Sequence, residues 1–334
     1  MIKLLSISTD RNLFKADSAV RARQIDYARE RDETHIIVFA TRDFNFKPEK
    51  IAENCFVYST NSSSKWFYIF DAIALGGKII SEQVITNLTC QDPFLTGLTG
   101  WWLKRCARKI NFLNLEIQVH TDIGSQYFAY TFGNKIRKKI AKFVLPRADQ
   151  IRVVSERIKN FLVREWGIVE SKITVKPIFV DTDKIKKAEI TVDLHQKYPE
   201  FSKIALIASR LEPEKNIYLP LKAWQQVIKV KPQAGLVIVG AGAEEDNLKF
   251  VVKKLKLENN VIFEPWQTNL ATYYKTADLF LLTSFFEGYG LTLMEAQAAG
   301  CKIISTDVGV AREVGTRIVG YQVGEITQAI IENL

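Results

Sequence analysis

The apolar positions of this chain fall into short runs, separated by longer segments whose apolar residues recur at helical spacing. Runs that are apolar throughout predict strands buried on both faces, and the amphipathic segments predict the helices that cover them. In the first half the predicted strands are Lys3–Ser8, His35–Ala40, Phe56–Ser59, Gln83–Leu88, Leu115–Val119, Ile151–Val154 and Lys172–Lys176. The predicted helices there are Ser18–Asp32, Lys65–Ile80, Thr96–Lys109, Asn134–Val144 and Glu156–Trp166.

The alternation of strand and helix stops at Asp181–Ser202, which is rich in charge, and then begins again. The second set of predicted strands is Lys203–Ala208, Leu236–Val239, Val261–Glu264, Leu279–Thr283 and Lys302–Ser305. The helices predicted with them are Ile217–Lys231, Glu244–Leu257, Thr268–Lys275, Leu291–Ala299 and Glu325–Asn333. This pattern predicts two doubly wound α/β domains, residues 1–180 and 203–334, joined by a linker over 181–202.

Composition narrows the functional classes. The chain has 334 residues, 47% hydrophobic and 25% charged, which is typical of a globular protein large enough for two domains. Four isolated cysteines and three histidines argue against a disulfide framework or a zinc site, and favour the reducing cytoplasm. The most apolar run, Trp66–Leu75, contains Asp71 and is too short to span a bilayer. No secretory signal is visible.

The net charge of +9 favours an anionic partner. Because no nucleic-acid-binding motif accompanies it, we expect no nucleic acid and favour phosphorylated substrates or a membrane surface. Asn134–Val144 is basic and follows the aromatic segment Tyr127–Phe132, while Gly100–Arg105 mixes tryptophans with cations. Such segments suit docking on an anionic membrane, and the alternative for each is a core-packed helix with a charged outer face.

The candidate site residues are most concentrated in the segment Ser284–Gly309. Its strand runs into the turn Glu287-Gly288-Tyr289-Gly290, from which a helix starts at Leu291. The free N–H groups and dipole of a helix N-terminus favour an anion such as a phosphate. Glu287 and Glu295 add carboxylates that accept hydrogen bonds from sugar hydroxyls. The pattern therefore predicts a site for a phosphorylated sugar.

Other polar residues follow predicted strands, at the end where open parallel sheets bind ligands. They are Asp10, His120, Arg210, Gly240 and Asp307. Arg210 and Lys215, between a strand and a helix, could clamp a diphosphate, although a solvated turn is the alternative. Gly240 lies in an incomplete glycine fingerprint that fits either nucleotide approach or a tight turn. For His120 a structural and a functional role are both open, and Asp181-Thr182-Asp183, which has the spacing of a metal-binding D-x-D motif, is interpreted as a solvated loop.

With these motifs in place, the chain resembles the retaining glycosyltransferases of family 4, of the group 1 type, which have the GT-B fold of two Rossmann-like domains facing across a cleft. The resemblance is strongest from Ala277 to Gly309, ADLFLLTSFFEGYGLTLMEAQAAGCKIISTDVG. SRLEPEKN resembles the diphosphate clamp of the family and IVGAGAEEDNL its glycine turn. ADQIRVVSERIKNFL and VKPIFVDTD resemble the end of its acceptor domain.

The resemblance implies a nucleotide-sugar donor, held mainly by the second domain, and an acceptor held mainly by the first. His120 and Glu287 would act on the donor sugar as the catalytic pair, Arg210 and Lys215 would bind the diphosphate, and Glu295 the ribose. The remaining donor-binding candidates are Gly240, Gly288, Tyr289, Gly290 and Leu291, with Ser18 and Trp266 as two further ones. The N-terminal loop lacks the glycine pair of the family, and Ser18 could replace one contact. The family is usually metal-independent, so we expect no metal or other cofactor.

The function predicted in this way is a hexosyltransferase-type glycosyltransferase of glycan, glycolipid or exopolysaccharide synthesis, acting with retention. We expect it in the cytoplasm, with peripheral contact at the inner face of the membrane and a glycan or lipid-linked acceptor. The alternatives are a catalytically impaired nucleotide-sugar-binding homologue and an epimerase of the same fold. Family members continue past the position of Leu334 into a helix that crosses back to the first domain, and its absence here leaves interdomain closure open.

Overall fold

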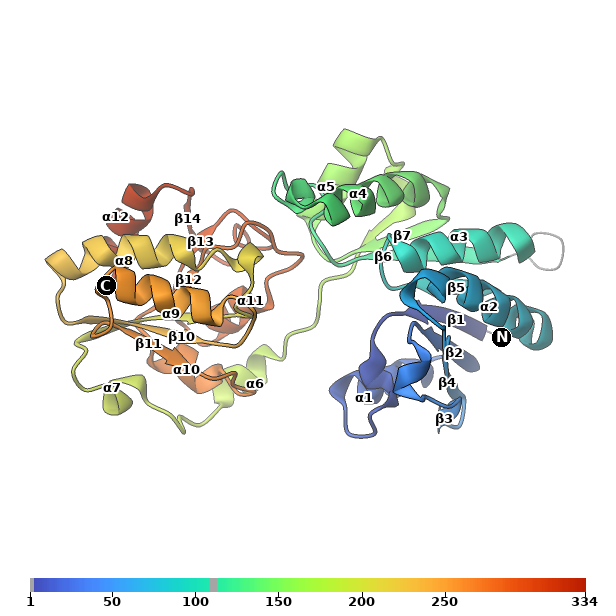
Figure 1. Ribbon diagram of the computed structural model, residues 1–334, viewed down its shortest axis with the longest axis horizontal. Coiled ribbons are helices and arrows are strands. Elements are labelled where there is room, and N and C mark those ends of the chain that lie inside the picture. The colour runs from blue at the N-terminus through green and yellow to red at the C-terminus, as the bar shows by residue number, and fades with distance from the viewer. Residues whose placement is uncertain (1–2, 108–112) are drawn as a thin grey trace. The chain divides into compact units, whose positions relative to one another are not determined.

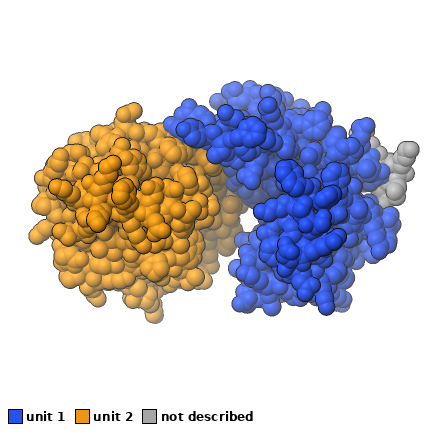
Figure 2. All heavy atoms as spheres, in the orientation of Figure 1, with its two compact units in different colours: residues 1–176 blue, residues 177–334 orange. Residues whose placement is uncertain are grey.

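The computed structural model describes residues 3–107 and 113–334, so the last predicted residues of the helix Thr96–Lys109 lie outside the described part. The chain divides into two compact units, Met1–Lys176 and Pro177–Leu334, coloured separately in Figure 2. Each unit is a largely parallel sheet flanked by helices (Figure 1). The segment predicted as a linker, 181–202, lies in the second unit, where it contains α6 (Thr182–Lys187) and α7 (Leu194–Lys197).

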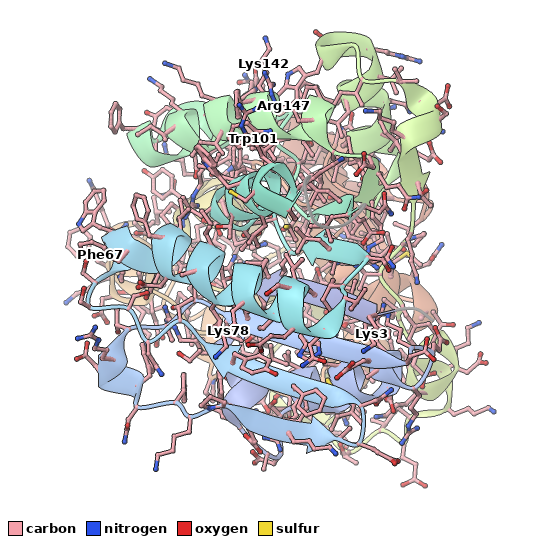
Figure 3. The ribbon with its side chains drawn as sticks, turned by 90° about the vertical axis from the view of Figure 1, so that its right-hand side faces the viewer. Lys3, Phe67, Lys78, Trp101, Lys142 and Arg147 are labelled. Atoms are coloured by element: carbon pink, nitrogen blue, oxygen red, sulfur yellow. The ribbon has the colours of Figure 1, made fainter. Side chains whose placement is uncertain are left out.

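The sheet of the first unit has the order β3-β4-β2-β1-β5-β6-β7-β8, and all neighbouring strands are parallel except β3 and β4. Its strands are β1 (Lys3–Ser8), β2 (Glu33–Val38), β3 (Glu49–Ala52), β4 (Cys55–Ser59), β5 (Asn87–Cys90), β6 (Asn114–Val119), β7 (Gln150–Val153) and β8 (Ile173–Val175). Its helices are α1 (Ala19–Ala28), α2 (Tyr68–Gln83), α3 (Leu95–Ala107), α4 (Phe132–Val144) and α5 (Glu156–Trp166). Figure 3 shows α2 lying across one face of the blue strands.

Local sequence sets several of these helix ends. Ser155 caps α5 by accepting a hydrogen bond from the backbone N–H of Ile158, and Gly167 ends the helix in the left-handed region. Thr131 caps α4 in the same way, accepting from the N–H of Asn134. The predictions for these two helices are confirmed.

The sheet of the second unit has the order β11-β10-β9-β12-β13-β14, with every pair of neighbours parallel. Its strands are β9 (Lys203–Ala208), β10 (Ala234–Val239), β11 (Val261–Glu264), β12 (Leu279–Leu282), β13 (Lys302–Thr306) and β14 (Arg317–Val319). Besides α6 and α7 its helices are α8 (Tyr218–Val230), α9 (Glu245–Lys254), α10 (Ala271–Thr276), α11 (Leu291–Ala298) and α12 (Val323–Asn333).

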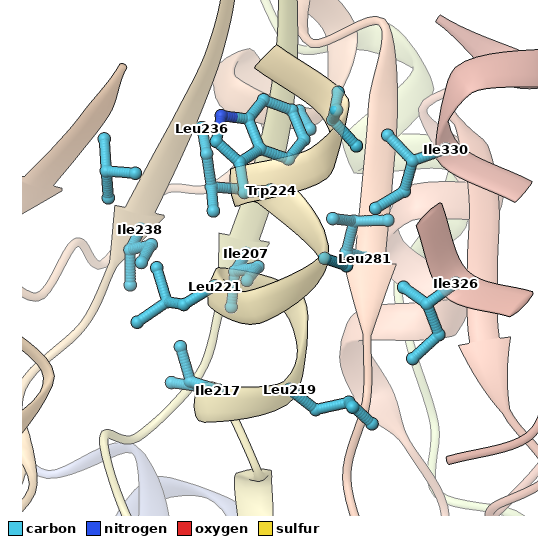
Figure 4. Packing of buried hydrophobic residues seen from close by; sticks show 14 of the residues in the cluster. Ile207, Ile217, Leu219, Leu221, Trp224, Leu236, Ile238, Leu281, Ile326 and Ile330 are labelled. Atoms are coloured by element: carbon cyan, nitrogen blue, oxygen red, sulfur yellow. The ribbon is translucent and has the colours of Figure 1, made fainter. Parts of the chain in front are cut away.

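The core of the second unit centres on α8. Its Trp224 is fully buried among side chains of β9, β10 and β12, such as Ile207, Leu236 and Leu281 (Figure 4). Ile326 and Ile330 of α12 close the cluster on the other side. Burying a large aliphatic or aromatic side chain stabilises a fold by roughly 1.5–3 kcal/mol. The core therefore gives the loops at the carboxyl ends of β9, β10 and β12 a rigid base.

The structure corrects several predicted elements. The strand predicted at Gln83–Leu88 exists but is displaced, because α2 continues to Gln83 and β5 runs from Asn87 to Cys90. The true bounds of β5 were missed because Asn87 and Thr89 are polar and interrupt the apolar run on which the prediction relied. The edge strand β3, which pairs antiparallel with β4, and the short strand β14 were not predicted.

Candidate functional site

The loop from β12 to α11 is held from several sides. The backbone carbonyl of Ser284 accepts hydrogen bonds from the hydroxyls of Thr306, at 2.7 Å, and Tyr321, at 3.1 Å. The backbone N–H of Val310 donates to the carbonyl of Tyr289 at 2.9 Å. Because these contacts come from the end of β13 and from the segments after β13 and β14, the loop is fixed before α11 begins.

Gly309 permits this arrangement. Its φ is +51°, and a Cβ atom there would lie 2.2 Å from the carbonyl oxygen of Tyr289. A side chain would therefore push the two loops apart. Gly290, the residue before α11, also has a positive φ, of +91°, and turns the chain so that the first N–H groups of α11 follow directly on the loop.

Lys215 and Glu287 form an ion pair at the centre of the site. The Nζ of Lys215 lies 2.6 Å from Oε1 of Glu287, and each side chain is only 14% exposed. The hydroxyl of Ser284 donates to the same carboxylate oxygen at 2.7 Å. The pair joins the β9–α8 connection to the β12–α11 loop, so the predicted diphosphate and sugar contacts lie side by side.

The backbone also joins these two segments. The N–H of Phe285 donates to the carbonyl of Glu214 at 2.8 Å, and the side-chain amide of Asn216 donates to the carbonyl of Thr283 at 3.3 Å. Asn216 itself has a left-handed conformation that ends the short helix η7 (Pro213–Lys215). The position of Lys215 is thus set by backbone contacts as well as by its charge.

Arg210, the other predicted diphosphate ligand, lies on the same connection after β9. Its side chain is 58% exposed, and its guanidinium pairs with Glu214 at 2.9 Å. An exposed pair of this kind stabilises the fold little, so Arg210 can leave Glu214 for an anionic ligand at small cost.

Gly240, at the end of β10, lies against the β9 connection. A Cβ atom at this position would lie 1.9 Å from the carbonyl oxygen of Ser209, and Leu211 donates its N–H to the carbonyl of Ala241 at 2.9 Å. The close packing of these two loops therefore requires a glycine at position 240. A contact of Gly240 with the nucleotide stays a prediction.

Glu295 lies in α11, and its Oε2 accepts a hydrogen bond from the hydroxyl of Tyr274 at 3.1 Å. Burial raises the pKa of Glu295 and the hydrogen bond from Tyr274 lowers it, with burial the larger effect. Tyr274, in α10, is 1% exposed and was not predicted as a site residue. Its signal in the sequence was weak, since one tyrosine of a short helix is ordinarily a core residue.

His120 follows β6 in the first unit. Its Nε2 lies 2.9 Å from the side-chain oxygen of Gln118. Desolvation by the surrounding chain, together with the charges of Arg152 and Arg23, lowers the pKa of His120 to about 4. The imidazole is therefore neutral at physiological pH.

The two further candidates differ in what holds them. The hydroxyl of Ser18 caps α1, accepting from the N–H of Arg21 at 3.1 Å, and donates to the carbonyl of Asn12. This local role explains the serine without a ligand. Trp266 follows β11 and is 56% exposed. Their contacts with a donor stay predictions.

Asp181 of the D-x-D segment caps α6 by accepting from the N–H of Lys184 at 2.9 Å. Among the described residues, no three His, Cys, Asp or Glu side chains are grouped so that they could hold a metal ion. None of the helices in residues 3–107 and 113–334 has the length and apolar character that crossing a membrane requires.

Comparison with known proteins gives two family matches. The model described as Glycosyltransferase Family 4 matches residues 26–184, and the model described as Glycosyl transferases group 1 matches residues 193–323. A curated relative, the alpha-monoglucosyldiacylglycerol synthase of Streptococcus pneumoniae, is 30% identical over 68% of this chain and 53% of its own length. Alignments with the first curated relatives span only 20–53% of their lengths.

Two solved structures resemble the whole chain. The sucrose-phosphate synthase of Thermosynechococcus elongatus superposes with a TM-score of 0.78 at 19% identity, covering 99% of this chain and 89% of that one. The Anabaena protein HepE in complex with UDP-glucose gives a TM-score of 0.71 at 19% identity, covering 99% and 88%. At this identity the likeness shows the fold, and it confirms the predicted GT-B class with its two Rossmann-like sheets.

Proposed function

Because this chain belongs to the group 1 glycosyltransferases of family 4, we propose that it transfers a sugar from a nucleoside-diphosphate donor to an acceptor. One observation carries the proposal. Lys215 of the β9–α8 connection and Glu287 of the loop before α11 lie within 2.6 Å of each other, both largely out of water, and the N-terminus of α11 follows directly on that loop. Cation, backbone N–H groups and carboxylate are the groups that a diphosphate and a sugar require together.

Each group of the second unit then has a role. Lys215 and Arg210 bind the diphosphate, and the N–H groups from Gly288 to Leu291 add neutral donors to the phosphate and the sugar. Such preorganised donors stabilise the charge that develops on the leaving diphosphate, a role that needs no metal ion. We propose that transfer retains the anomeric configuration.

The two carboxylates divide the hydroxyl groups of the donor. Tyr274 occupies Oε2 of Glu295, which leaves Oε1 to accept from the ribose hydroxyls. Glu287, held by Lys215 and Ser284, accepts from the donor sugar. We propose that His120 of the first unit, whose imidazole is neutral, acts on the donor sugar.

A ligand screen tests the donor site. Thermal-shift measurements with UDP-, GDP-, ADP- and dTDP-sugars should show a higher melting temperature with one base, because a ligand of the folded state stabilises it by mass action. Calorimetry with that donor should show weaker binding in Lys215→Ala and Glu295→Ala. Lys249→Ala, which removes an exposed lysine of α9, is the matched control. Unchanged affinity in both site variants would refute the assignment.

Product analysis separates the alternative functions. Transfer that persists with a chelator supports the metal-independent mechanism, and its complete loss refutes it. Tight donor binding with neither transfer nor slow hydrolysis identifies a binding homologue, and a changed sugar on the donor alone identifies an epimerase.

The acceptor side of the proposal rests on α4. Phe132, Ile136 and Phe143 recur at helical spacing along this helix and are 78%, 45% and 39% exposed. Exposed cations flank this apolar stripe, at Lys135, Arg137, Lys139 and Lys142. An exposed apolar stripe bordered by cations suits the headgroup region of an anionic bilayer.

The stripe continues onto neighbouring elements. The ring of Trp101 in α3 packs edge-on against Phe143 at 5.0 Å, and the guanidinium of Arg147 lies 3.9 Å from the centre of the Phe143 ring. Figure 3 labels Trp101, Lys142 and Arg147 at this place. We therefore propose peripheral contact with an anionic membrane and, with it, a lipid-linked or glycan acceptor. The pneumococcal relative is an alpha-monoglucosyldiacylglycerol synthase, which supports this class of acceptor.

Vesicle sedimentation tests the membrane contact. The protein should sediment with vesicles containing phosphatidylglycerol and remain in solution with pure phosphatidylcholine. Phe132→Ser with Ile136→Ser should weaken sedimentation, whereas Phe250→Ser, which removes a 64% exposed ring from α9, should leave it unchanged. Equal sedimentation of the double variant and the parent would contradict the proposal.

A further inference from the structure

A chain of three hydrogen bonds runs from Glu116 to His120 in the first unit. The hydroxyl of Thr89 donates to Oε1 of Glu116 at 2.9 Å, and the side-chain amide nitrogen of Gln118 donates to the same hydroxyl oxygen at 2.9 Å. The amide oxygen of Gln118 lies 2.9 Å from Nε2 of His120. Residues 116 and 118 alternate along β6 and His120 continues the alternation just after the strand, so the three side chains lie on one side of the chain. Thr89 is the register partner of Glu116 on β5.

The direction of this chain follows from the chemistry of its first member. A carboxylate can only accept hydrogen bonds, so the proton of the Thr89 hydroxyl must point to Glu116. The Thr89 oxygen can then only accept from Gln118, which turns the NH₂ group of the amide toward Thr89. The amide oxygen therefore faces His120, and the hydrogen bond can form only if Nε2 of His120 carries the proton.

The charged groups around these three hydrogen bonds are consistent with a proton on Nε2 of His120 and none on Nδ1. The charge of Glu116 raises the pKa of the Arg31 guanidinium, against a larger lowering by burial, so the carboxylate lies within reach of a permanent cation. Arg152, the register partner of Gln118 on β7, and Arg23 of α1 both disfavour a second proton on His120. The His120 imidazole is therefore neutral, with its single N–H at Nε2.

We propose that Glu116, Thr89 and Gln118 are positioning residues, which fix His120 as its Nε2–H tautomer and leave Nδ1 as a hydrogen-bond acceptor. Among the described residues Nδ1 has no hydrogen-bond partner. This inference rests on the proposed function, and it adds a statement about specificity. An unprotonated Nδ1 can only accept, so any sugar group that His120 contacts must donate, as a hydroxyl or an N–H does, and a sugar with an ether or a deoxy position there is disfavoured.

Nitrogen NMR of the protein with ¹⁵N-labelled histidine tests the tautomer without any substrate. The chain has only three histidines, and the signals of His120 are those lost in His120→Asn. Between about pH 6 and 8 the parent should show a protonated Nε2 and an unprotonated Nδ1, as expected for a neutral imidazole. A protonated Nδ1 in the parent would overturn the proposal.

Two variants test the hydrogen-bond chain from Glu116 to His120. In Glu116→Gln the new amide can donate to Thr89, and in Thr89→Val the chain is cut, so each should give a mixture of tautomers. Thr34→Val is the matched control, because Thr34 is a buried threonine of β2 whose hydroxyl has no hydrogen-bond partner in the described part of the protein. Unchanged tautomers in both chain variants would refute the positioning role, even if their activity fell.

A titration with UDP-glucose then links the tautomer to the donor. The Nδ1 signal should move as it accepts a hydrogen bond, while free UDP should leave it in place. In the chain variants, turnover of UDP-glucose should fall by about 2- to 10-fold, which corresponds to one neutral hydrogen bond, with UDP affinity unchanged. If the tautomer is as inferred but UDP-glucose leaves Nδ1 in place, the positioning chain stands and the role of His120 toward this donor is refuted.

Discussion

The Lys215–Glu287 ion pair can be tested by a double-mutant cycle for its effect on stability. Replacing Lys215 by Met leaves the Glu287 carboxylate, 14% exposed, with the Ser284 hydroxyl as its remaining side-chain donor among the described residues. Losing one partner of a fully buried pair costs about 3–5 kcal/mol, and the residual exposure of this pair brings the expected loss to about 2–3 kcal/mol. Glu287→Gln keeps the shape and an acceptor oxygen, so it should cost about 1–2 kcal/mol.

The double variant leaves neither charge uncompensated and should cost less than the two single variants together. We expect a coupling free energy of about 1–2 kcal/mol. The measurement is urea unfolding, with the units followed separately by amide exchange of their peptides, because a chain of two units need not unfold in one step. Lys249→Met is the control. It breaks a pair of the same 2.6 Å length on the surface of the same unit, and the urea midpoint should not move. Additive effects of Lys215→Met and Glu287→Gln would refute the reasoning.

The remaining predictions concern ligand binding, a glycine and pH. Glu287→Gln should bind a free nucleoside diphosphate at least as tightly as the parent, because Lys215 no longer shares its charge, while sugar transfer falls; calorimetry showing weaker binding would contradict this. Gly309→Ala should cost more stability than Gly300→Ala in thermal unfolding. Both have positive φ, but only the first would place a Cβ atom against a backbone oxygen, and equal losses would show that the contact is unimportant. Burial raises the pKa of Glu264, but hydrogen bonds from Lys197, Tyr198 and Tyr273 lower it more, so the folded value lies below the usual 4.5. This stabilisation is present above pH 4.5 and lost as the pH falls through the folded pKa, and Glu264→Gln should flatten that part of the stability curve.

The sequence predicted the sheets well where a strand is buried on both faces. β9, β10 and β12 are continuous apolar runs, and their bounds agree with the prediction within two residues. β3 was missed because an exposed edge strand needs no apolar pattern, and its residues Glu49 and Lys50 resemble a loop. The end of α2 was missed for a similar reason. The helix ends at Val84, which has a left-handed conformation, and the sequence has no glycine there to indicate the end.

For the site, the motif predicted which residues matter but not how they pair. Lys215 and Glu287 are 72 positions apart, and nothing in their spacing shows that the lysine lies against this carboxylate. The same holds for Tyr274 and Glu295, and for Gln118 beneath His120. Side-chain partners of this kind depend on strand register and loop packing, which a single sequence does not contain.

The contacts between residues 181–198 and the rest of the second unit matter for the engineering of chimeric enzymes. Glu264 holds Lys197 and Tyr198, each at 2.6 Å, Asp278 holds His195 at 3.0 Å, and Lys275 holds the carbonyl of Lys186 at 2.8 Å. A recombination point placed just before β9 would separate these partners and leave carboxylates without their cations. A junction near Lys176 keeps them in one inherited block, so halves exchanged with a relative should be joined there.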